Sequence, residues 1–216
     1  MIMWLYGKPF SGKTKFASEF PKPYFLSLDK NAQYITDDYV NISSIQEYSD
    51  ALRDFLNDPG EHETLVIDTI DLLEQYVRAY YLDKLGIEDE SDRDDYGKAW
   101  RLIREGSFQP ILKAMEFEGN VIFISHEDMY TTKNIVGSEV TNYKPGINDK
   151  LHDRISGLTS IIGRSFKDSK KVGGEVINRY YVSFGSIPEE LSGTRVPLKD
   201  VKIENTYEAF KENIKK

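Results

Sequence analysis

A phosphate-binding loop motif near the start of the chain restricts its possible folds more than any other feature. Residues 7–14 read Gly-Lys-Pro-Phe-Ser-Gly-Lys-Thr, which fits the pattern G-x-x-x-x-G-K-T. The apolar residues 2–6 suit a buried strand, and residues 15–20 can begin a helix. A P-loop requires this order of strand, loop and helix. The motif therefore predicts an α/β fold that binds a nucleoside triphosphate.

Each part of the motif has a chemical role in holding a triphosphate. Glycines let the backbone turn tightly and point successive N–H groups at the phosphates, while the helix N-terminus adds positive potential. Lys13 is expected to reach the β- and γ-phosphates, and the Thr14 hydroxyl to bind Mg²⁺. We therefore expect ATP and Mg²⁺ as cofactors. The candidate nucleotide contacts in the motif are Gly7, Lys8, Pro9, Phe10, Ser11, Gly12, Lys13 and Thr14.

The composition favours one soluble domain. With 216 residues, of which 39% are hydrophobic and 30% charged, the chain is expected to form a single domain over residues 1–216. No apolar run approaches the roughly 20 residues of a membrane span, and the first strand begins too early for a targeting peptide. The absence of cysteine excludes disulfides, thiolate catalysis and cysteine zinc sites, which fits a cytoplasmic protein.

Charge is distributed unevenly along the chain. The net charge of −8 argues against nonspecific binding of nucleic acid, and residues 88–95 carry six acids against one base. Residues 164–179 have the opposite balance, because two acids stand among five bases. A local basic surface is therefore compatible with the acidic whole. The five bases are Arg164, Lys167, Lys170, Lys171 and Arg179.

Apolar stretches alternate with helical patterns in the first two thirds of the chain. Buried strands are expected at residues 2–6, 24–28, 64–67 and 121–125. Helices are expected at residues 44–56, 71–85 and 96–117, with the last interrupted near Gly106 and Pro110. Continuous apolar strands that alternate with helices indicate a mainly parallel sheet covered on both faces.

The last third of the chain is richer in β patterns. Residues from about 127 to 148 are predicted to form a mobile loop or hairpin, and residues 148–156 a short helix. Residues 172–174 suit a turn, and residues 206–214 a final helix. Antiparallel strands are expected to extend the sheet at residues 161–166, 176–177 and 179–184.

Acidic residues at strand ends supply further candidates for the site. Asp68 ends the strand at 64–67, at the sheet edge where α/β folds bind ligands, and is expected to bind Mg²⁺ with Thr14. Thr69 follows it, so the glutamate found there in many ATPases is missing. Asp29, which ends the strand at 24–28, is our candidate for the catalytic carboxylate, and Asp71 is the alternative. Asp29 equally suits a cap or turn.

A polar pair ends the fourth strand. Ser125 and His126 follow its apolar residues directly, and in a P-loop sheet this position often senses the γ-phosphate. Either side chain is expected to couple the nucleotide to the segment that follows. An ordinary polar strand end is the alternative.

The order of these features resembles the RecA-like, phage-encoded ATPases of the Sak-type recombinase or annealing family. The resemblance includes the P-loop, residues 25–29, residues 65–69 and residues 121–127, and it extends over nearly the whole chain. It implies an ATPase that binds single-stranded DNA as a homo-oligomer, a filament or a ring. It further implies a role in phage recombination or replication, with other phage proteins as partners, in the cytoplasm of a phage-infected or prophage-carrying bacterium. The start at Met1 is consistent with a RecA core that lacks an N-terminal oligomerisation domain.

The resemblance also implies roles for individual residues. Asp29 occupies the position of the RecA-type catalytic acid, and Ser125 and His126 that of the sensor. Arg195 is expected to reach the nucleotide of a neighbouring subunit, although a surface arginine is the alternative. The segment at about 127–148 corresponds to the mobile DNA-binding loop, with Lys133, Tyr143 and Lys144 as its candidate contacts.

Two other functions use the same P-loop. A nucleotide-switched module would bind ATP with little hydrolysis and load a phage replication partner, which the missing glutamate after Asp68 would explain. A small-molecule kinase would need a basic lid, for which only Arg93, Arg101 and Arg104 are at hand in acidic surroundings. A DNA-linked ATPase remains our first hypothesis.

Overall fold

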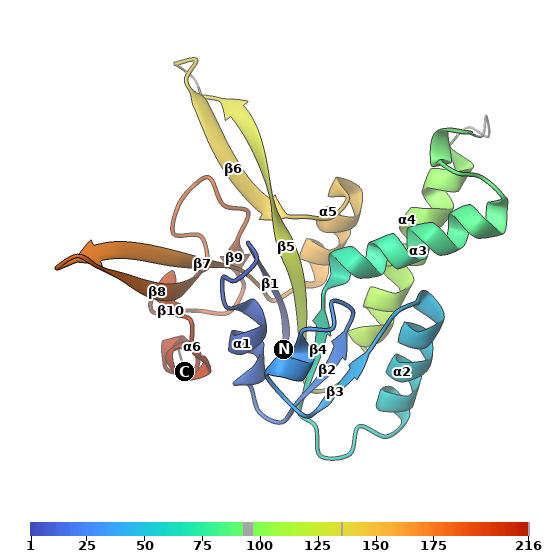
Figure 1. Cartoon of the computed structure of the whole chain (residues 1–216), viewed down its shortest axis with the longest axis horizontal. Coiled ribbons are helices and arrows are strands. Elements are labelled where there is room, and N and C mark those ends of the chain that lie inside the picture. The colour runs from blue at the N-terminus through green and yellow to red at the C-terminus, as the bar shows by residue number, and fades with distance from the viewer. Residues whose placement is uncertain (93–96, 135, 216) are drawn as a thin grey trace.

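The computed structural model describes residues 1–92, 97–134 and 136–215, and within these ranges it contains one sheet of ten strands (Figure 1). The strands are β1 (Ile2–Gly7), β2 (Pro23–Ser27), β3 (Tyr39–Asn41), β4 (Thr64–Asp68), β5 (Asn120–Lys133), β6 (Glu139–Pro145), β7 (Ile161–Val172), β8 (Glu175–Ser183), β9 (Gly193–Thr194) and β10 (Lys202–Glu204). Neighbouring strands follow the order β10-β8-β7-β1-β5-β4-β2-β3, while β6 pairs with β5 and β9 with β7. Arg93 and the predicted helix start at Tyr96 lie outside the described residues.

The centre of the sheet is parallel, as the sequence predicted. β1 pairs in parallel with β5 and β7, β4 with β5 and β2, and β2 with β3. The four predicted apolar strands are confirmed as β1, β2, β4 and β5. The strands β3, β9 and β10 were not predicted, because two or three residues are too few to show a pattern of alternation.

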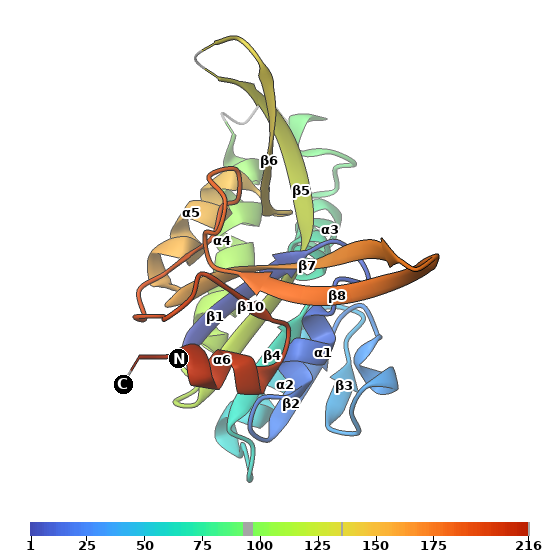
Figure 2. The same cartoon turned by 90° about the vertical axis from the view of Figure 1, so that its left-hand side faces the viewer.

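Helices cover both faces of the sheet (Figure 2). Side chains alternate along β1, so Met3 and Leu5 pack toward α1 and α6, whereas Trp4 packs toward α2, α3, α4 and α5. No helix in the described ranges is both long and apolar enough to span a bilayer. The helices are α1 (Lys13–Ser18), α2 (Ile45–Asn57), α3 (Ile70–Leu85), α4 (Lys98–Ala114), α5 (Asp149–Leu158) and α6 (Tyr207–Asn213), with 3₁₀ turns η1 (Ala32–Tyr34) and η2 (Glu90–Asp92).

The predicted interruption of the third helix is wrong, because α4 continues through Gly106 and Pro110. Gly106 contacts α3, since a Cβ on this residue would lie 2.3 Å from the Tyr81 ring. Pro110 removes one backbone donor, but Phe108 and Ile111 on the same turn are buried in the core. Packing of α4 on its neighbours therefore outweighs the local preference to break the helix.

Two long hairpins extend from the sheet (Figures 1 and 2). β5 continues beyond the sheet and pairs with β6, so the segment predicted as a loop or hairpin is a hairpin. β7 and β8 form the second, whose turn at Gly173 and Gly174 has positive φ angles of 62° and 90°. The antiparallel pairing of β7 with β8 is as expected, but β7 also joins β1 in parallel after the chain returns through α5.

Candidate nucleotide-binding site

The loop at residues 7–14 and the carboxyl ends of β2, β4 and β5 surround a cavity of about 380 Å³. This is the sheet edge at which open α/β folds bind their ligands. Its lining includes most of the P-loop together with Asp29, Asp68, Thr69 and His126. Residues from four separate parts of the sequence therefore meet at one cavity.

The P-loop has the backbone shape that a phosphate site needs. Gly12 adopts a φ angle of 92° at the N-cap of α1, a conformation that favours glycine. Lys13 is buried, and its Nζ donates hydrogen bonds to the carbonyl oxygens of Gly7 at 2.8 Å and Lys8 at 2.9 Å. Burial lowers the pKa of Lys13, and the negative charge of the nearby carboxylates partly opposes this shift. In the structure these two carbonyl oxygens accept the hydrogen bonds that Lys13 would give to a bound phosphate.

Thr14 and Asp68 meet at the floor of the cavity. The Thr14 hydroxyl donates a hydrogen bond of 2.7 Å to Asp68 Oδ2. Asp68 is almost completely buried, and burial, together with the neighbouring Asp29 carboxylate, raises its pKa to about 7. A bound cation would stabilise the ionised form of this carboxyl, so Asp68 is suited to be a metal ligand.

The residues at this site fit a magnesium ion held jointly with a nucleotide. Thr14 and Asp68 supply two oxygen ligands, and Mg²⁺ ordinarily keeps several waters and binds substrate phosphates besides one or two protein ligands. No group of three or more His, Asp or Glu side chains in the described ranges could hold a metal alone. The donor set therefore fits a metal that enters with the triphosphate.

Asp29 lines the same cavity, and its carboxylate is held in place by its own loop. Asn31 donates to it from the backbone N–H at 3.0 Å and from the side-chain amide at 2.7 Å. Its charge is close enough to Asp68 to raise the pKa of that residue. Asp29 therefore both accepts hydrogen bonds within its turn and lines the cavity. Its catalytic role stays a prediction.

His126 reaches the cavity and is fixed there by Asp71. The His126 backbone N–H and its ring Nδ1 lie 3.1 Å and 2.8 Å from the two Asp71 carboxylate oxygens. The hydrogen bond to Asp71 raises the pKa of His126, and burial opposes this. Asp71, our alternative catalytic acid, therefore orients a histidine at the site.

Ser125 does not reach the nucleotide cavity. Its side chain is fully buried on the opposite face of the sheet, where Ser125 Oγ accepts a hydrogen bond of 3.0 Å from Trp4 Nε1. The period of two along β5 places neighbouring side chains on opposite faces, so only one member of the pair can point to the site. The expectation that Ser125 contacts the nucleotide is therefore wrong, and of the two residues His126 alone lines the cavity.

Arg195 lies at the other edge of the sheet from the P-loop of its own chain. It follows β9, which pairs with the first residues of β7, and its guanidinium donates to the Thr159 carbonyl at 2.6 Å. The side chain therefore has no contact with the cavity of its own chain. Its predicted reach to a neighbouring subunit stays a prediction.

The three candidate DNA contacts occur on the β5–β6 hairpin, but two of them are already engaged. The Arg164 guanidinium lies 3.6 Å from the centre of the Tyr143 ring, so one face of that ring is covered. Lys144 forms an ion pair with Asp149 and lies over the Tyr130 ring. Lys133 is exposed near the end of β5.

Two braces of the P-loop could not be predicted from the sequence. Ser165 of β7 donates a hydrogen bond of 2.7 Å to the Ser11 carbonyl. Asn205 donates one of 3.0 Å from its side chain to the Gly12 carbonyl. These partners are separated by 154 and 193 residues, and no motif marks either serine or asparagine.

Comparisons with known proteins agree with this geometry. A family model described as an AAA domain matches residues 1–194. The "SPbeta prophage-derived uncharacterized protein YorG" of Bacillus subtilis (strain 168) is 22% identical over 130 residues, which are 58% of this chain and 40% of that protein. The matched region thus spans less than half of the relative's length.

A solved structure shows the same fold. The KaiC-like protein of the archaeon Pyrococcus horikoshii OT3 has a TM-score of 0.50 and 14% identity, over 94% of this chain and 83% of that one. At this identity the likeness concerns the fold alone. It supports the RecA-like interpretation of the sheet.

Proposed function

Because the chain belongs to the AAA domain family of P-loop NTPases, we propose that it binds Mg²⁺-ATP at the loop of residues 7–14 and hydrolyses it. The observation that carries the proposal is the meeting of Lys13, the Thr14–Asp68 pair and His126 at one cavity. These groups come from β5, the end of β4 and the start of α1. Such convergence supplies a cation, a metal-binding pair and a sensor to the same phosphates.

The chain's own residues divide the work of catalysis. Lys13 and the P-loop N–H groups bind the phosphates, and Thr14 with Asp68 would hold the metal, whose charge offsets that on the phosphates. Asp29 accepts a proton from, or orients, the attacking water. His126, held by Asp71, donates a hydrogen bond toward the terminal phosphate and responds to its loss.

We further propose a DNA-linked role as a homo-oligomer. The β5–β6 hairpin begins directly after His126, so a change at the phosphate reaches the hairpin through one strand. Met129 and Tyr130 are exposed on it, and an exposed aromatic ring on a hairpin can stack on a base of single-stranded DNA. The resemblance to the Sak-type family and the prophage origin of the relative support single-stranded DNA and a role in phage recombination or replication.

One experiment tests the ATPase and its link to DNA. ATP turnover of the purified chain is measured with and without single-stranded DNA, at two salt concentrations, beside its mass with nucleotide bound. We expect DNA to raise turnover, and salt to weaken DNA binding steeply. Lys13→Ala should abolish turnover because it removes the phosphate clamp. Turnover that is unaffected by DNA at any protein concentration contradicts the DNA link, and an active Lys13→Ala variant contradicts the site.

A nucleotide switch with little hydrolysis is the second candidate. Thr69 stands where many ATPases have a glutamate, and its hydroxyl is buried without a hydrogen-bond partner. Tight ATP binding with negligible turnover in the presence of DNA would favour this function over the first.

A further inference from the structure

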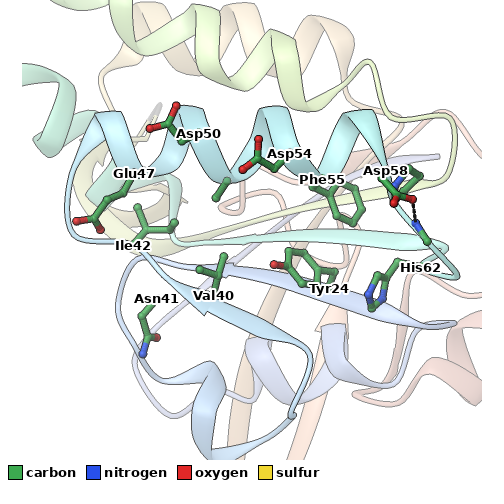
Figure 3. A pocket seen from close by; sticks show the side chains of 13 residues that line it. Tyr24, Val40, Asn41, Ile42, Glu47, Asp50, Asp54, Phe55, Asp58 and His62 are labelled. Atoms are coloured by element: carbon green, nitrogen blue, oxygen red, sulfur yellow. Dashed lines mark hydrogen bonds between the residues drawn. The ribbon is translucent and has the colours of Figure 1, made fainter.

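An open groove lies at one end of the sheet and shares no lining residue with the nucleotide cavity. It has a volume of about 640 Å³ and lies between α2 and the strands β2 and β3 (Figure 3). β3 is the last strand of the sheet and pairs only with β2. Tyr24, Val40 and Phe55 form an apolar part of the lining, in which the rings of Tyr24 and Phe55 stack. Nothing in the described chain fills this groove.

The rim of the groove is strongly acidic. Four exposed carboxylates line it, three on α2 and one at the C-cap of that helix. Arg53 forms ion pairs with two of them, Asp50 and Asp54, which leaves the rim negative. An occupant of this groove would therefore combine positive charge with apolar side chains. The four carboxylates are Glu47, Asp50, Asp54 and Asp58.

The β7–β8 hairpin carries this combination on one face. Residues directly opposite each other in an antiparallel pair share a face, and Lys167 lies opposite Tyr180 and Lys171 opposite Val176. Between them the face has only Ser169 and Asn178, so it contains two bases and no acid. We call this set of six residues the basic face of the hairpin.

The opposite face of the hairpin carries its bases together with an acid. There Lys170 lies opposite Ile177 and Asp168 opposite Arg179, so bases and an acid alternate. Lys170 also forms an ion pair with Asp168. The opposite face thus also carries two bases and the apolar Ile177, but Asp168 offsets part of their charge, whereas the basic face has no acid.

Among the described residues, no further strand pairs with the distal part of the hairpin. β1 pairs with β7 only as far as Arg164, and β10 pairs with β8 only from Tyr181 onward. Val176 on the basic face is 57% exposed, whereas Tyr180 is 41% exposed and lies beside Gly12 of the P-loop. A two-stranded hairpin is marginally stable by itself in water, so a bound surface would stabilise it.

We propose that the basic face of the hairpin docks in the acidic groove of a second copy of this chain. The β7–β8 hairpin lies toward one end of the sheet, and α2 and β3, which line the groove, lie at the other, so one chain cannot join its own two surfaces (Figure 1). Contacts between different surfaces on successive copies produce a closed ring or an open filament. The proposed function includes a homo-oligomer, and this docking rests on it and assigns its contact surfaces.

Charge reversal on each surface tests the docking without measuring ATP turnover. Lys167→Glu with Lys171→Glu reverses the hairpin, and Asp50→Lys with Asp54→Lys reverses the groove. Mass is measured over a range of protein concentrations, with and without Mg²⁺-ATP. We expect the wild type to associate less at high salt, and each variant alone to weaken association at least about tenfold. An equimolar mixture of the two variants should associate again, because each hairpin then meets a groove of opposite charge.

Matched controls separate docking from a general effect of charge. Lys170→Glu with Arg179→Glu makes the same change on the other face of the hairpin, and Glu208→Lys with Glu212→Lys changes exposed acids of α6. Both controls should associate like the wild type, and thermal melts should show all variants folded.

The proposal is overturned if both reversed variants still associate, or if their mixture remains monomeric. Loss of DNA binding by the hairpin variant with its mass unchanged also overturns it, in favour of a DNA surface. A wild type that is monomeric under every condition overturns the homo-oligomer as well. None of these mass measurements tests ATP hydrolysis. The docking can therefore be wrong while the proposed ATPase activity is right.

Discussion

At the scale of single residues, the buried position of Asp68 suits it to bind a metal but lowers the stability of the nucleotide-free protein. Its pKa of about 7 in the folded chain compares with 3.8 for the unperturbed group. Well below pH 3.8 the carboxyl is protonated in both the folded and the unfolded state. As the pH rises from about 4 to 7, the unfolded chain loses this proton first, so the folded state is progressively destabilised, and above pH 7 the penalty is constant.

Asp68→Asn is therefore expected to stabilise the nucleotide-free protein. At pH 8 the free energy of unfolding should rise by about 2–4 kcal/mol, while near pH 4 the gain should be small. The same change removes a metal ligand, so magnesium-dependent ATP binding should be lost. Urea unfolding at the two pH values and nucleotide titration measure both effects. A variant destabilised equally at both pH values would contradict the assigned burial of this carboxyl.

His126 and Asp71 give the opposite dependence on pH. The raised pKa of His126 means that the protonated ring is favoured by the folded state. Its contribution to stability is full below the ordinary histidine pKa of about 6.5 and is lost as the pH rises through the raised value. The Asp71 carboxylate causes this effect, because it accepts from both the ring and the backbone N–H.

Asp71→Asn should lower the pKa of His126 toward its ordinary value. NMR titration of the ring protons measures this directly, since the chain has three histidines. The ring signals of His62 and His152 serve as internal references, because neither residue forms a hydrogen bond with Asp71 in the described structure. A His126 titration that is identical in the variant would show that the Asp71 contact is not formed in solution.

At the scale of elements, the P-loop depends on a strand that is distant in sequence. A Cβ on Gly7 would lie 2.2 Å from the Ser165 backbone oxygen of β7 and 2.7 Å from Ser11 Oγ. The loop therefore passes β7 at a distance that only glycine allows. Relief of the clash requires the backbone of the P-loop or of β7 to move.

Gly7→Ala should accordingly lower the free energy of unfolding by about 1–3 kcal/mol and weaken ATP binding. Gly157→Ala is the matched control, because Gly157 lies in α5 with nothing within 4 Å of its added Cβ. That change should leave stability equal or raise it by about 0.5–1 kcal/mol. Equal effects of the two substitutions on denaturant unfolding would rule out the close approach of β7.

Elements with a strong local pattern were predictable, whereas elements fixed by contacts were not. Ser44 caps α2 and Gly86 ends α3 in a left-handed conformation, and both boundaries were expected from the residue types. α4 passes through Gly106 and Pro110 because the packing of its buried side chains opposes two local breakers. The three residues of β3 form a strand only because β2 offers them a partner.

At the scale of the whole molecule, the β5–β6 hairpin is separable from the nucleotide site. Met129 pairs with Tyr143, and beyond this pair the described residues of the hairpin pair with no other strand. Tyr143 itself is held by Arg164 and by the backbone of Glu189. The hairpin can therefore be shortened to this pair without disturbing its base.

Replacement of residues 130–142 by Asn-Gly tests the role of the hairpin. This two-residue sequence favours the turn that joins paired strands at Met129 and Tyr143. We expect ATP binding to be retained and the stimulation by single-stranded DNA to be lost. Turnover with and without DNA measures the effect, and stimulation that persists would assign DNA binding to another surface.

The sequence by itself determined the P-loop, the parallel strands and the acids at their ends, because each depends on residue type and spacing within a short window. Lys13, Thr14 and Asp68 were predictable for this reason. Tertiary structure alone decided that Ser125 points away from the site, that Asp71 holds His126, and that Ser165 and Asn205 brace the loop. The face on which a side chain lies and the partner that it meets depend on register and on contacts between distant segments, which local sequence does not encode.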